Sequence, residues 1–206
     1  MSVANTLVTA DAAYLVTDGG WTDLASRRLL DIKDKVFEVS GTSTVLTALG
    51  GAWVAPYLHM DAEQQSYQTY DDVIAGLIGR LPDTIREVHE QVPGAPRHWG
   101  EFAIVVVGWQ DGPRAHLVYV NDAGAAVPRV NKRAAPNFKA IPCAENLYQS
   151  DIEGSAVRLL EAQRAVETPE GVVATGFVQL TTVGPKGVSR KVLHRWPDRV
   201  GAIPQR

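Results

Sequence analysis

The stretch TLVTADAAYLVTDGG, residues 6–20, decides how the chain begins to fold. Valine, leucine, threonine and tyrosine dominate both sides of Asp11, and these residue types favour extended backbone. The DGG run at the end of the stretch is typical of a turn. Residues 6–16 are therefore predicted to form a β-hairpin that turns near Asp11.

A second β-rich pair follows at residues 35–39 and 44–49. The SGT run between them and the GG pair at 50–51 have the composition of turns. The first fifty residues are thus predicted to be mostly sheet.

Residues 52–92 change to apolar side chains spaced by three and four, which predicts two helices. Asp71 and Asp72 suit the first turn of the second helix, because acidic groups there complement the helix dipole. Pro82 is expected to break or restart that helix.

The remaining segments follow from the same signals. Residues 123–146, with three prolines, are expected to be irregular. Strands are predicted at 102–109, 116–121, 176–183 and 189–196, and a third helix at 150–165. Because strands and helices fall in separate blocks, an α+β domain with layered sheets is favoured over a βαβ repeat. At 206 residues, we expect a single domain over 1–198 and a C-terminal tail over 199–206.

Composition excludes several functions. The net charge of −3 and the scattered lysines and arginines argue against a nucleic-acid partner. The apolar runs are too short to cross a membrane, and the N-terminus has no apolar signal region. A lone cysteine, Cys143, is typical of a reducing cytoplasm. No metal-ligand spacing or nucleotide-binding loop is present, so no metal or other cofactor is expected.

Three short motifs carry a resemblance to a known family. LVTDGG at 15–20, KDKVF at 33–37 and ALGG at 48–51 follow one another in the order and approximate spacing of proteasome β-subunits and the peptidases of bacterial two-component proteases. These belong to the N-terminal nucleophile (Ntn) hydrolases. Residues 103–124 are similar to the family's middle strands. The resemblance covers residues 2–124 and implies a four-layer αββα sandwich of two antiparallel sheets.

The resemblance also implies catalytic roles. Counting back sixteen residues from Asp18, the family's separation between acid and nucleophile, leads to Ser2. Removal of Met1 would give Ser2 a free α-amine, with an ordinary pKa of about 8, as its own general base. Lys35, with Lys33 as the less favoured alternative, would supply positive charge, and Asp18 would orient that lysine.

Two further positions match the family's site. A backbone N–H of Gly50 or Gly51 would stabilise the oxyanion, and Thr175 takes the place of a conserved hydroxyl. Read without the resemblance, Asp18 belongs to an ordinary turn, Lys35 begins a strand with a solvated side chain, and Ser2 is a disordered terminal residue.

One departure favours a rival interpretation. The family carries an acid shortly before the hydroxyl residue, whereas VVATGF at 172–177 has none. The chain is thus either a homo-oligomeric hydrolase acting on peptides or other amides, or a catalytically inactive ring subunit or virion-type component. Trp53, Tyr57 and Leu58 are expected at subunit contacts.

Overall fold

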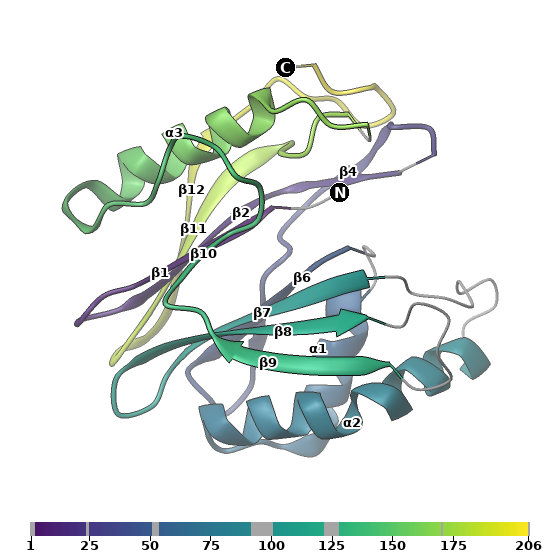
Figure 1. The fold of residues 1–206 in the computed structure, drawn as a ribbon, viewed down its shortest axis with the longest axis vertical. Helices are drawn as coiled ribbons and strands as arrows, with labels where there is room; N and C mark the ends of the chain where they lie inside the picture. The colour runs from purple at the N-terminus through teal and green to yellow at the C-terminus, as the bar shows by residue number, and fades with distance from the viewer. Residues whose placement is uncertain are drawn as a thin grey trace.

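The computed structural model describes residues 3–23, 25–50, 54–91, 101–121, 128–169 and 171–205. Over these residues the protein is an α+β fold with two five-stranded antiparallel sheets and three α-helices (Figure 1). No helix in these ranges is long and apolar enough to span a membrane.

The first sheet joins strands from both ends of the chain. Its order is β10-β1-β2-β11-β12. The bounds are β1 Ala4–Val8, β2 Ala13–Asp18, β10 Asn137–Lys139, β11 Phe177–Gly184 and β12 Gly187–Arg195. The β1–β2 pair is the hairpin predicted from residues 6–16. Because β2 lies at the centre of the sheet, its last residue, Asp18, is placed beside both β1 and β11.

The second sheet is built from the middle of the chain. Its order is β5-β6-β7-β8-β9. The bounds are β5 Phe37–Val39, β6 Thr44–Leu49, β7 Glu101–Trp109, β8 Pro113–Asn121 and β9 Arg129–Ala134. A separate small pair, β3 Gly20–Thr22 with β4 Leu29–Ile32, follows directly after β2.

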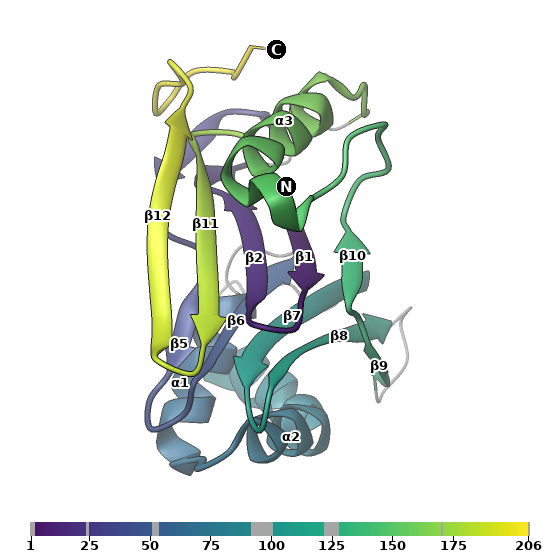
Figure 2. The same cartoon turned by 90° about the vertical axis from the view of Figure 1, so that its left-hand side faces the viewer.

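The helices divide between the two sheets. Helices α1 Val54–Gln65 and α2 Tyr70–Gln91 lie against the second sheet, and α3 Ile152–Ala165 lies against the first (Figures 1 and 2). A short 3-10 turn, η1 Gln149–Asp151, precedes α3. The side chain of Asp151 caps α3 by accepting a hydrogen bond from Gly154 N at 3.1 Å.

Three apolar clusters hold these elements together. One contains Leu15 of β2 and Val105 of β7, so it joins the two sheets directly. Another packs Leu77 of α2 against the second sheet, and the third packs Leu160 of α3 against Val16 of β2. Successive residues of a strand point to opposite faces of the sheet. Both faces of β2 are covered by other elements, and both therefore carry apolar side chains.

Several local expectations were wrong. Residues 123–146 are not irregular throughout, because they contain β9 and β10; Figure 2 shows the chain passing from one into the other. Backbone hydrogen bonds to β8 hold β9 in the sheet, and those to β1 hold β10. β9 is mostly polar and exposed, so it has no alternating apolar pattern that would predict a strand. Pro82 stays inside α2 and does not end it.

Two further expectations need correction. Asp18-Gly19-Gly20 is not a free turn, since Gly19 N and Gly20 N donate to Thr175 O at 3.1 and 2.8 Å. Leu58 is not available for a subunit contact, because it is buried in the core between α1 and the second sheet. Trp53 lies outside the described residues.

The segment 199–205, expected as a tail, is hydrogen-bonded to the small β3–β4 pair. Leu29 N donates to Ala202 O at 2.9 Å, and Gly201 N donates to Leu29 O at 2.7 Å. This contact places the end of the chain beside the strands that follow Asp18.

Candidate functional site

Asp18 is the centre of the candidate site. Its side chain is completely buried at the end of β2. Oδ1 accepts hydrogen bonds from Lys35 Nζ at 2.8 Å and from Val3 N at 3.1 Å. Oδ2 accepts from Thr175 N at 3.1 Å. A buried carboxylate needs such donors, because burial of an unpaired charge is costly.

Lys35 brings a buried positive charge to this carboxylate. It lies just before β5 and is only 5% exposed. Burial lowers the pKa of the Lys35 ammonium from its ordinary value, and the charge of Asp18 and its hydrogen bond act in the opposite direction. A lysine of lowered pKa, held by a carboxylate, can stabilise negative charge or take part in proton transfer.

The alternative lysine lies elsewhere. Lys33 is exposed, forms an ion pair with Asp31 at 2.9 Å, and its ammonium lies 4.6 Å from the centre of the Trp21 ring. The structure therefore brings Lys35, the favoured of the two lysines, to Asp18. Residues 33–36 lie between β4 and β5 and belong to neither strand, so the two lysines are not held on one face of a sheet.

The amide of Val3 connects this pair to the start of the chain. Val3 N belongs to the peptide bond that joins residue 2 to residue 3, and it donates to the same oxygen as Lys35 Nζ. The chain is thus anchored to Asp18 immediately after residue 2. Ser2 itself lies outside the described residues.

Thr175 lies just before β11, which flanks β2 on the side away from β1. Besides its backbone N–H, its Oγ1 lies 3.4 Å from Asp18 Oδ2, a long hydrogen bond. The approach of this segment requires Gly20, because a Cβ there would lie 1.8 Å from Thr175 Oγ1. The sequence-predicted residues Asp18, Lys35 and Thr175 are therefore in contact through one carboxylate.

Gly50 directly follows the last residue of β6, an inner strand of the second sheet. Its φ of +116° is unfavourable for residues with a side chain, and an added Cβ would lie 2.8 Å from Phe102 Cβ. In Figure 1, the start of β1 and the end of β6 are the right-hand ends of these two strands. Gly51, the other expected oxyanion donor, lies outside the described residues.

Sequence reasoning missed two charged residues that support Thr175. Arg164 Nη1 donates to Ala174 O at 2.7 Å, and Asp198 Oδ2 accepts from Gly176 N at 2.8 Å. The one available signal was Arg164 itself, a charged residue at the end of the apolar face of α3. Asp198 followed a predicted strand and looked like part of an ordinary chain end.

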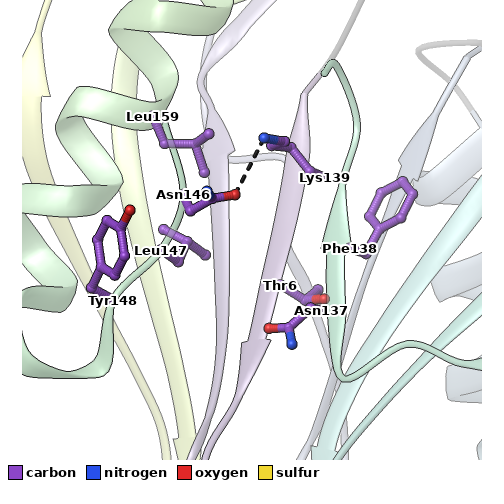
Figure 3. A pocket seen from close by; sticks show the side chains of 8 residues that line it. All are labelled: Thr6, Asn137, Phe138, Lys139, Asn146, Leu147, Tyr148 and Leu159. Carbon is purple, nitrogen blue, oxygen red and sulfur yellow. Dashed lines mark hydrogen bonds between the residues drawn. The ribbon is translucent and has the colours of Figure 1, made fainter. Parts of the chain in front are cut away.

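A hollow of about 440 Å³ lies apart from this site, between β10 and the segment that leads into α3 (Figure 3). Lys139 is its cationic residue, but Nζ already donates to Cys143 O at 2.6 Å and Glu145 O at 3.0 Å. Because that ammonium is satisfied within the chain, the hollow offers no free charge to a ligand. None of the three contacting residues of the candidate site lines it.

The described residues contain no group of three or more histidine, cysteine, aspartate or glutamate side chains able to hold a metal ion. The sequence matches no family model and no curated protein with which it was compared. The geometry around Asp18 and the three short motifs at 15–20, 33–37 and 48–51 are therefore the features of this chain that bear on its function.

Proposed function

We propose that this chain is an Ntn hydrolase, similar to proteasome β-subunits, which cleaves peptide or other amide bonds with Ser2 after removal of Met1. The fold proposed with it is the four-layer αββα sandwich. Support comes from the three apolar clusters, one between the sheets and one between each sheet and its helices.

One observation carries the proposal: Val3 N and Lys35 Nζ donate to the same oxygen of buried Asp18. A chain that only needed a stable core would gain little from this arrangement. Replacing a buried ion pair with apolar side chains is often neutral or stabilising. A nucleophile at residue 2, however, needs a fixed main chain and a nearby positive charge.

The proposed reaction begins at the amide carbonyl of the substrate. Ser2 Oγ attacks the carbonyl carbon while its proton passes to the Ser2 α-amine. The positive charge of Lys35 lowers the pKa of that amine and stabilises the oxygen as it loses its proton. Backbone N–H groups at Gly50 or Gly51 stabilise the oxyanion.

The resulting tetrahedral intermediate then collapses. The carbon–nitrogen bond breaks, the protonated α-amine returns its proton to the leaving amine, and an ester to Ser2 remains. Water hydrolyses this ester by the same proton transfers in reverse order, which regenerates the free serine.

A second candidate function is favoured by a specific observation. The stretch VVATGF at 172–177 contains no acidic residue ahead of Thr175, where the family usually carries one. This favours a catalytically inactive protein of the same fold, acting as a ring subunit or virion-type component. Either candidate would assemble with copies of itself. Sedimentation as a monomer at micromolar concentration would contradict that assembly.

The state of residue 2 separates the two candidates. For the hydrolase, the intact mass should correspond to the chain without Met1, and a peptide with an electrophilic C-terminal group should label Ser2 covalently. The Ser2→Ala variant, purified in the same way, is the control and should not be labelled. Retained or acetylated Met1, or equal labelling of both proteins, would support the inactive assembly component.

A further inference from the structure

Arg164 and Asp198 form a second buried ion pair near the candidate site. Arg164 Nη1 and Asp198 Oδ2 are 2.9 Å apart, and Nη2 and Oδ1 are 2.7 Å apart. The side chains are only 8% and 3% exposed. Two parallel hydrogen bonds fix the planar guanidinium against the carboxylate, which gives the pair a defined orientation.

This pair holds the backbone on both sides of Thr175. Arg164 donates to the carbonyl of Ala174, and Asp198 accepts from the amide of Gly176. Thr175 therefore has little freedom to move along or away from β2. Its own amide and hydroxyl are directed at Asp18 Oδ2.

Two residues near the C-terminus, Trp196 and Gln205, also contact Arg164. The backbone carbonyl of Gln205 accepts a hydrogen bond from Arg164 Nη2. The Trp196 ring lies beneath the guanidinium, with 4.7 Å between the ring centre and Cζ. Arg164 thus links helix α3, the 174–176 segment and the C-terminal segment at one point.

We propose that Arg164 and Asp198 are positioning residues for the Asp18–Lys35 centre, acting through the backbone around Thr175. Neither residue is assigned a chemical step. Their role is to keep the Thr175 amide on Asp18 and to exclude water from that side of the carboxylate. The inference builds on the centre of the proposed function, but it does not require turnover.

The pKa of the Lys35 ammonium reports on this role. If the 174–176 segment moves away, water reaches Asp18 and Lys35, and the burial that lowers the lysine pKa is relieved. Asp18 also loses the hydrogen bond from the Thr175 amide, so its negative charge acts more strongly on Lys35. Both effects raise the pKa of Lys35.

The test is a pH titration of Lys35 by NMR in protein with isotope-labelled lysine. The variant Arg164→Met with Asp198→Leu removes both contacts to the 174–176 backbone and leaves no unpaired buried charge. The pKa of Lys35 should rise by at least about 0.5 unit. The amides of Thr175 and Gly176 should also exchange with solvent faster than in the wild type.

Arg80→Met with Asp61→Leu is the matched control. That pair joins α2 to α1, with Arg80 Nη2 2.8 Å from Asp61 Oδ1. Its loss should leave the pKa of Lys35 unchanged. An equal shift in both double variants, or no shift in the first, would overturn the proposal.

A single substitution keeps the test decisive if the double variant does not fold. Asp198→Asn retains an oxygen that can accept from Gly176 N but removes the charge that orients Arg164. It should raise the pKa of Lys35 above the wild-type value, and an unchanged value would count against the proposal. A raised Lys35 pKa in these variants of a protein that hydrolyses no amide would support the positioning role and contradict the proposed hydrolase.

Discussion

Val3 and Lys35 share one hydrogen-bond acceptor: the amide of Val3 and the ammonium of Lys35 both donate to Asp18 Oδ1, at 3.1 and 2.8 Å. The first described residue of the chain and a buried cation are thereby held together. This relationship makes residue 2 the focus of the proposed chemistry. It also makes Lys35 the residue whose substitution is most informative.

Lys35→Met should reduce turnover of a peptide amide at least about 100-fold, because the developing charge on Ser2 would lose its compensating cation. Lys35→Arg should restore little, since the planar guanidinium presents its charge differently from an ammonium. The measurement is hydrolysis of a chromogenic peptide amide. Lys33→Met is the control and should react close to the wild-type rate, because Lys33 is exposed and paired with Asp31. Equal loss in both variants would contradict the assignment.

The stability of the protein should depend on the titration of Lys35. Burial lowers its pKa in the folded state below the ordinary 10.5, so the unfolded chain binds more protons between these two values. The free energy of unfolding should therefore rise with pH across that interval, and the penalty is fully present below the lowered pKa. Urea unfolding across the alkaline range should show wild type gaining stability relative to Lys35→Met. A relative loss would show that the folded-state pKa is raised.

Gly50→Ala should destabilise the protein by about 1–3 kcal/mol, because alanine is unfavourable at a φ of +116° and its Cβ would approach Phe102. Gly79→Ala is a contrasting control. Gly79 lies inside α2 with open space around it, so alanine should stabilise the helix by about 0.5–1 kcal/mol. Denaturant unfolding of both variants measures the difference. A harmless Gly50→Ala would mean that this backbone conformation is not required.

Pro82→Ala should raise the free energy of unfolding by about 1–3 kcal/mol. Proline inside α2 removes a backbone donor and crowds the preceding turn, whereas alanine is the most favourable helix residue. Thermal and urea unfolding check this prediction. Unchanged or lower stability would indicate that packing of the half-buried proline ring offsets its cost to the helix.

The strands of the first hairpin and of the buried pair β7–β8 were predictable because their residue types match their environment. β7 is almost continuously apolar, since one face meets the first sheet and the other meets the helices. β9 and β10 were not predictable in this way. Their strand structure comes from hydrogen bonds to neighbouring strands: β10 pairs with β1, which is distant in the sequence, and β9, which is mostly exposed and polar, pairs with β8.

The sequence by itself predicted the first hairpin and the helical blocks, because local propensity is a property of neighbouring residues. The family resemblance pointed to Asp18, to Thr175 and to one of the two lysines, Lys35 or Lys33. Only the tertiary structure decided which lysine meets Asp18 and which residues support Thr175. The Arg164–Asp198 pair joins positions 34 residues apart, and Thr175 meets Asp18 across 157 residues. Such contacts depend on how the sheets and helices pack, and the burial that lowers the pKa of Lys35 exists only once that packing is complete.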